Sequence, residues 1–142
     1  MRNILIFLLA IVPAVIMAQK GSVLGKWKAI DDHTGEAVSI VEIFENQGKI
    51  YGKVLEIFNP ADRNKKCVSC PGADKNKPLI GLTVIKGLTK DGDEYNGGEI
   101  LDPKHGKLYD CYITLENANK LKVRGYIGLA FLGRTQYWHR VQ

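Results

Sequence analysis

The feature that most constrains this chain is a strict alternation of apolar and polar residues near its C-terminus, over residues 120–141. The residues on one face of the first extended segment are Leu121, Val123, Gly125 and Ile127. Lys120, Lys122 and Arg124 fall on the other face, and a repeat of two is typical of a strand that is buried on one side. A second such run follows a short apolar connection, and on it Arg134, Gln136, Trp138 and Arg140 share a face. The two runs predict an antiparallel hairpin against which the rest of the sheet must close.

Turn residues divide the preceding chain into further segments that resemble strands. These segments occupy residues 24–30, 38–44, 49–58, 82–89, 95–101 and 107–115. Clusters of Asp, Asn and Gly separate most of them, and no helical periodicity appears beyond the N-terminal apolar run. About eight antiparallel strands in a meander remove their unpaired edges by closing into a barrel. The expected fold is therefore an all-β, eight-stranded antiparallel meander barrel, and the alternative that the same pattern permits is a two-sheet sandwich.

The N-terminus has the organisation of a secretory signal peptide. Arg2 precedes an apolar run over residues 4–17, and Ala18 is a small residue suited to cleavage. The run is too short for a comfortable membrane span. We therefore expect a signal peptide over residues 1–18 and a single barrel domain over residues 19–142, in a protein exported to the periplasm or the extracellular space. The alternative is that the segment is retained as an N-terminal anchor.

The net charge of +5 arises from basic residues that are scattered along the chain. A dispersed excess of this kind is typical of a solvated surface, and export argues further against a nucleic-acid partner. The histidines are not at ligand spacing from one another, so neither a metal nor another cofactor is expected. These residues are His33, His105 and His139.

Cysteine usage agrees with export. Cys67 and Cys70 lie in a long polar stretch over residues 59–78, and Cys111 lies alone on the apolar face of a strand-like segment. In an exported chain, a disulfide between Cys67 and Cys70 is the simplest interpretation. The main rival is a pairing of Cys111 with one of the loop cysteines. A redox activity of the Cys-x-x-Cys pair is a weaker interpretation, because no helix is predicted to begin there and lower the thiol pKa.

Several segments resemble a known family. The sequence GKW places Trp27 at the start of the first strand, and Arg134 and Arg140 lie on the last one, which is similar to the lipocalin arrangement of a Trp beneath a late Arg. The longer segments that carry the resemblance are GKWKAIDDHTGEAVSIVEIFENQGKIYGKV, PLIGLTVIKGL, GGEILDPKHGKLYDC and VRGYIGLAFLGRTQYWHRV. Together they resemble an exported bacterial family known as domain of unknown function 2147. The resemblance implies a lipocalin-like barrel and an exported location, and it implies no established activity.

Two features are candidates for binding. The barrel interior and the connection at residues 128–133 supply the candidate ligand contacts, which are Trp27, Tyr109, Phe131, Arg134 and Trp138. In a domain of this size, interior positions also serve simply as core. The apolar connection, with Leu129 and Leu132 at the ends of its tip, is suited to an envelope protein or a membrane surface, or to folding back over the barrel.

These observations favour a non-enzymatic binding module for a small apolar or amphipathic molecule. The alternative is a structural or interaction protein of the cell envelope with a filled core. No nucleophile elbow, glycine-rich phosphate loop or metal-ligand spacing points to catalysis.

Overall fold

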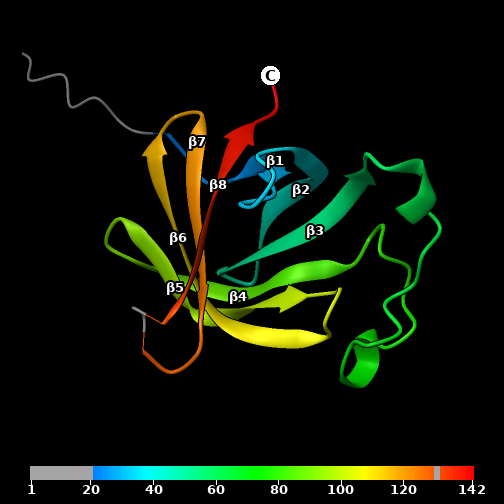
Figure 1. The fold of residues 1–142 in the computed structure, drawn as a ribbon. Helices are drawn as coiled ribbons and strands as arrows, with labels where there is room; N and C mark the ends of the chain where they lie inside the picture. Colours follow the sequence, from blue (N-terminus) through cyan, green and yellow to red (C-terminus); the bar gives the residue numbers. More distant parts are fainter. Residues whose placement is uncertain (1–20, 130–131) are drawn as a thin grey trace, which may run out of the picture.

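Eight strands close into an antiparallel barrel in the computed structural model, which describes residues 21–129 and 132–142 (Figure 1). In chain order the strands are β1 (Gly25–Ile30), β2 (Ala37–Asn46), β3 (Lys49–Ile57), β4 (Thr83–Asp91), β5 (Glu94–Asp102), β6 (Lys107–Asn117), β7 (Lys120–Tyr126) and β8 (Gly133–Arg140). Each strand pairs with the next, and β8 pairs back onto β1 through Trp27 opposite Arg140 and Lys28 opposite His139. The predicted meander barrel is confirmed, and the closed sheet rules out the two-sheet sandwich.

The barrel interior is filled by apolar side chains from the alternating inward positions. The largest side chains with almost no exposure are Trp27, Val41, Ile43, Cys67, Leu82, Ile85, Leu88, Cys111, Ile113 and Leu121. Burying a large apolar side chain of this kind stabilises the fold by about 1.5–3 kcal/mol. Val123 and Trp138 join the same core.

Two strand pairs have register shifts at glycines. The register between β3 and β4 shifts on both sides of Gly52, and the register between β5 and β6 shifts between Tyr95 and Gly98. A Cβ atom on Gly98 would lie 2.2 Å from the carbonyl oxygen of Lys86, so only glycine allows the two backbones to come this close. Such bulges bend the strand and increase its local twist.

The strand order gives the barrel two different ends. The connections β1–β2, β3–β4, β5–β6 and β7–β8 all lie at one end, which we call the open end, because successive strands are antiparallel. The three remaining turns and the segment at residues 21–24 lie at the other, which we call the closed end.

Trp27 and Arg140 seal the closed end. The Arg140 guanidinium lies 4.2 Å from the centre of the Trp27 ring, and the Trp27 Nε1–H donates to the Val23 carbonyl at 2.9 Å. Arg140 also donates to the carbonyl oxygens of Ala118 at 2.7 Å, Leu24 at 3.0 Å and Ser22 at 2.5 Å. One cation thus joins the N-terminal segment, the first strand and the β6–β7 turn.

The long β3–β4 connection is held together by a disulfide and by hydrogen bonds within it. Cys67 and Cys70 form a disulfide, with their Cα atoms 5.4 Å apart. Cys67 also donates its backbone N–H to Lys77 and accepts from Asn76, both at 2.8 Å. Two short 3-10 helices, η1 (Pro60–Asp62) and η2 (Gly72–Asp74), complete the connection.

The N-terminal prediction concerns residues outside the described part of the chain. The signal peptide expected over residues 1–18 therefore stays a prediction. Within residues 21–129 and 132–142, no helix is long and apolar enough to cross a membrane.

Candidate binding site at the open end of the barrel

A column of side chains on the inner face of β8 runs from the closed end to the open end. Arg140 lies at its base, Trp138 is only 3% exposed, and Gln136 is half-buried. Arg134 lies at the top, with a side chain that is 59% exposed. The column therefore changes from apolar to polar and charged as it reaches the mouth of the barrel, as the shared face in the sequence predicted.

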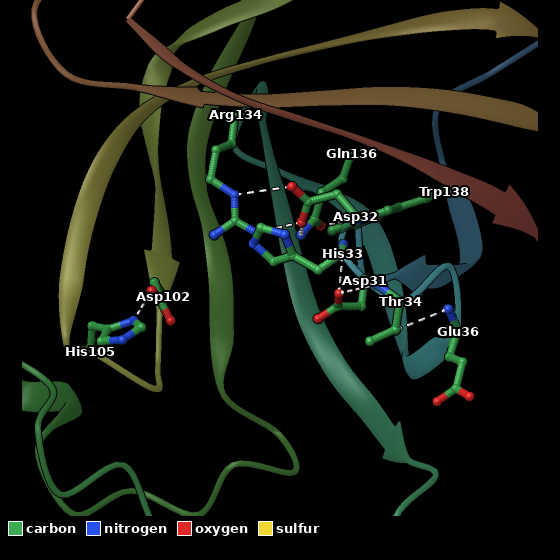
Figure 2. Close-up of polar contacts among 10 residues, drawn as sticks. All are labelled: Asp31, Asp32, His33, Thr34, Glu36, Asp102, His105, Arg134, Gln136 and Trp138. Carbon is green, nitrogen blue, oxygen red and sulfur yellow. Dashed lines mark hydrogen bonds and ion pairs between the residues drawn. The ribbon is translucent and has the colours of Figure 1, made fainter.

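Asp32, in the loop after β1, links this column to the neighbouring β1–β2 loop (Figure 2). Its carboxylate accepts from Arg134 Nε at 3.0 Å and from Arg134 Nη2, in a two-pronged ion pair. It also accepts from Gln136 Nε2 at 3.3 Å, and Gln136 Oε1 accepts from Trp138 Nε1 at 3.0 Å. The hydrogen bonds from Arg134 lower the pKa of Asp32, and those to Asp32 raise the pKa of Arg134.

The loop that carries Asp32 is itself ordered by hydrogen bonds. Asp31 accepts from the backbone N–H groups of His33 at 2.8 Å and Thr34 at 3.0 Å, which lowers the pKa of Asp31. The Thr34 hydroxyl accepts from the Glu36 backbone N–H at 3.2 Å. Local turn chemistry therefore fixes the loop that carries the Asp32 carboxylate.

A glycine on β7 lets side chains of neighbouring strands pack closely at the level of Arg134. Gly125 is directly opposite Arg134 in the sheet, and Ile100 is opposite Tyr109. A Cβ atom on Gly125 would lie 3.2 Å from Ile100 Cγ2 and 3.5 Å from Tyr109 Cβ. Gly125 is therefore the point at which Tyr109, Ile100 and Arg134 come together in one layer of the barrel, which we call the mouth layer.

The β5–β6 turn contributes a second polar group to this end. His105 Nδ1 lies 2.7 Å from Asp102 Oδ2, and Asp102 adds to the negative potential that raises the pKa of Arg134. The backbone N–H of Lys104 donates to Asp102 Oδ1 at 3.0 Å, which fixes that carboxylate in the turn. Figure 2 shows this pair separately from the Asp32–Arg134 pair.

The same turn packs against the disulfide loop. Gly106 has φ +66°, and a Cβ atom on it would lie 1.7 Å from the Ser69 carbonyl oxygen. Cys67 Sγ lies 3.5 Å from the Pro103 carbonyl oxygen. The disulfide loop is therefore fixed against the rim and is not free in solvent.

Exposed apolar side chains gather at the open end. Among the described residues, most of the exposed large hydrophobic side chains lie on its connections or on strand ends beside them, namely Val38, Val68, Ile80, Leu108, Ile127, Leu129 and Leu132. Ile127, predicted to face inward with Leu121, is 63% exposed, because β7 ends one residue earlier. The mouth is therefore polar within and apolar around its rim.

The five candidate contacts fall at different levels. Tyr109 and Arg134 belong to the mouth layer, and Trp138 lies in the core beneath them. Trp27 is fully buried at the closed end, far from the mouth along the barrel axis. Phe131 lies outside the described residues.

The cysteine prediction has a clear outcome. The disulfide between Cys67 and Cys70 is confirmed, so the rival pairing with Cys111 is wrong. Cys111 is a free, fully buried thiol, and burial raises its pKa to about 12. In the part of the chain that the structure describes, no group of three or more His, Cys, Asp or Glu is placed to hold a metal ion.

Sequence reasoning missed the role of Asp32. The Asp-rich segments between the predicted strands were interpreted as turns, which describes Asp31 correctly. No local signal shows that the neighbouring carboxylate meets a residue of the last strand.

A separate hollow of about 280 Å³ lies at the closed end. Its lining residues are Ser22, Leu24, Glu45, Gly48, Ile50, Lys90 and Tyr95.

The closed eight-stranded antiparallel barrel, with a Trp–Arg pair at one end, has a lipocalin-like fold. The model of the family described as "Uncharacterized protein conserved in bacteria (DUF2147)" matches residues 25–140, and the chain belongs to this family. A solved structure, reported as protein HP1028 from Helicobacter pylori and as belonging to the lipocalin family, is similar with a TM-score of 0.73. It is 23% identical in sequence, over 85% of this chain and 84% of that one. No curated protein matches the sequence.

Proposed function

We propose that this protein is an exported barrel that binds one small amphipathic molecule at its open end. The observation that carries the proposal is the mouth layer, where Ile100 and Tyr109 pack against Gly125 at the level of Arg134. Small antiparallel barrels of eight strands either fill their interior or hold one small ligand. The lipocalin-like fold and the family suggest a binding role in preference to a catalytic one.

The packed core limits how deep a ligand would lie. Trp138 and Cys111 are buried below the mouth layer, so the apolar part of the ligand would rest against Ile100, Tyr109 and the apolar rim. The polar part would meet Arg134. A guanidinium has five N–H donors in a planar fork, more than the single carboxylate of Asp32 accepts, so a ligand carboxylate or phosphate suits the remaining donors.

Export is part of the proposal. The N-terminal sequence has the features of a secretory signal peptide, and the Cys67–Cys70 disulfide is suited to an oxidising compartment.

The filled core also supports the second candidate, an envelope interaction protein without a small ligand. Trp27, Ile85, Ile113 and Leu121 have no measurable exposure, so the body of the barrel is stable without an occupant. The rim would then serve for contact with a partner.

Fluorescence titration with an undecanoic acid that carries a dansyl group would separate these candidates. We expect wild-type protein to bind the acid, and Arg134→Gln to bind it about tenfold more weakly because one charge-assisted contact is lost. The corresponding dansyl alcohol should bind both proteins equally.

Lys104→Gln is the matched control, because Lys104 is an exposed cation on the β5–β6 turn of the same end. Absence of any probe binding to wild-type protein would favour the filled-core candidate. An equal loss in Lys104→Gln and Arg134→Gln would mean that only general charge attracts the acid.

A further inference from the structure

The outer face of β7 carries a row of cations. Leu121 and Val123 are buried, so the alternate residues Lys120, Lys122 and Arg124 face outward and are half-buried. The strand contains no carboxylate. On one side of the barrel, therefore, a single strand presents positive charge in one line from the closed end toward the open end.

Tyrosine rings from the two neighbouring strands accompany these cations. Lys120 Nζ lies 4.7 Å from the ring centre of Tyr137 on β8, and Lys122 Nζ lies 5.5 Å from that of Tyr112 on β6. Tyr126 follows in the same row, with its ring centre 6.1 Å from that of Tyr112. Cation–π contacts hold the lysine stems along the wall of the barrel.

The row leads directly into the apolar end of the β7–β8 connection. Ile127, Leu129 and Leu132 are 63%, 58% and 56% exposed. Leu132 donates its backbone N–H to Leu129 at 2.9 Å, and Ile127 donates to Leu132 at 3.2 Å, so backbone hydrogen bonds join these three residues while their side chains face water. Three large apolar side chains thus project from one hairpin end, where no fold requirement explains them.

We propose that this face, the β7 row together with Ile127, Leu129 and Leu132, docks on the surface of an anionic lipid bilayer. The three elements match the layers of a membrane interface. Apolar side chains enter the acyl boundary, tyrosines suit the headgroup level, and cations attract anionic lipid phosphates. Charge complementarity with the cationic row argues for an anionic lipid surface and against a protein partner, since an apolar protein contact would not need the row.

The docking face lies beside the proposed ligand site. Arg134 follows the β7–β8 connection within two residues of Leu132 and faces into the mouth. A bilayer under this connection would bring the mouth within reach of amphipathic lipids. Docking does not depend on ligand binding, since it uses the outside of the wall.

Flotation with lipid vesicles tests the docking. The full chain is expressed, purified from the cell envelope as the cell processes it, and mixed with phosphatidylcholine vesicles that contain either 30% phosphatidylglycerol or none. We expect binding to the anionic vesicles and much weaker binding to the neutral ones. Raising the salt concentration should release the protein, because the headgroup attraction is screened.

Two sets of substitutions assign the contact. Ile127→Ser, Leu129→Ser and Leu132→Ser together should weaken vesicle binding about a hundredfold, as apolar burial is lost. Lys120→Gln with Lys122→Gln should weaken it about tenfold on anionic vesicles and leave the remaining binding less sensitive to salt.

The opposite wall supplies the matched control. Lys49→Gln with Lys53→Gln removes the same charge from β3, four strands away around the barrel, and should leave vesicle binding unchanged. Val68→Ser, at a site that is 68% exposed on the β3–β4 connection, should also have no effect.

Three outcomes would overturn the proposal. The first is that substituting the β7 lysines and substituting the β3 lysines weaken vesicle binding equally. The second is that Val68→Ser weakens vesicle binding as much as the triple variant does. The third is that the wild-type protein binds no vesicle. In the last case, dimerisation that the triple variant abolishes would identify a second copy as the occupant. Titration of the dansyl acid without vesicles reads the ligand site separately, so failure of either proposal is distinguishable from failure of the other.

Discussion

Asp32 and Arg134 lie 102 positions apart in the sequence and form a two-pronged ion pair that ties the β1–β2 loop to the start of β8. The pair lies at the end of the seam where β8 closes the barrel onto β1. It also holds the Arg134 guanidinium at a fixed orientation, since two parallel N–H···O contacts define a plane.

Replacing Asp32 with Asn should lower the free energy of unfolding by about 1 kcal/mol at neutral pH. The effect stays at this size because Arg134 is 59% exposed, and solvent screens such a pair. Urea unfolding measures it. Asp93→Asn, at an exposed position in the β4–β5 turn, is the control and should have no effect. Equal losses in the two variants would contradict a specific role of the ion pair.

The contribution of Asp32 to the free energy of unfolding should decrease at low pH. Its pKa is lowered in the fold from the ordinary value of 3.8, chiefly by the hydrogen bonds from Arg134. A lowered pKa adds stability that is fully present above pH 3.8 and is lost as the pH falls through the lower, folded-state pKa. The difference in unfolding free energy between wild type and Asp32→Asn should therefore be constant from neutral pH to about pH 5 and shrink below pH 3.8. A difference that grows on acidification would contradict this sign.

Replacing Arg140 with Ala should destabilise the barrel by about 3 kcal/mol, because three carbonyl oxygens lose a charged donor and Trp27 loses its cation. Arg140→Lys should fall between that variant and wild type, since it keeps the charge but not the planar fork. Chemical unfolding gives both values. Lys28→Ala, on the exposed face of β1, should change the free energy of unfolding little. An Arg140→Ala protein as stable as Lys28→Ala would show that the closed end does not depend on this cation.

Thiol labelling should detect one free cysteine, and this cysteine should react only after the protein is unfolded. Burial raises the pKa of Cys111 to about 12 and excludes reagent, so iodoacetamide should add nothing to the native protein. Denaturant alone should allow one addition, and denaturant with reductant should allow three, since Cys67 and Cys70 are then opened. Intact mass measures each state. Addition to the native protein would mean that the core around Cys111 opens readily.

Gly106 and Gly92 form a matched pair for testing the rim contact. Both have positive φ, +66° and +63°, but a Cβ atom on Gly92 would meet nothing within 4 Å. Gly92→Ala should therefore cost about 1 kcal/mol of backbone strain alone. Gly106→Ala should cost at least about 2 kcal/mol, because the new methyl group would collide with Ser69. Thermal unfolding of the two variants compares them, and equal midpoints would mean that the disulfide loop does not press against the β5–β6 turn.

The periodicity of the sequence was sufficient to predict the strands and the column of inward-facing side chains on β8. Side chains alternate in a strand whatever its neighbours are, so Arg134, Gln136, Trp138 and Arg140 were correctly placed on one face. Ile127 was placed wrongly, because alternation does not reveal where pairing with the next strand ends. The Cys-x-x-Cys disulfide was also readable, since its spacing is local.

The sequence by itself determined the strands and the turns, which follow from neighbours along the chain, and it favoured the short disulfide and the family resemblance. Only the closed barrel decided which late arginine covers Trp27 and which one meets Asp32. Pairing of Trp27 with Arg140 across the β1–β8 seam places Arg134 at the far end of the same strand, beside the β1–β2 loop. Such contacts depend on the register of hydrogen bonds between strands remote in sequence, and a repeat of two residues carries no information about that register.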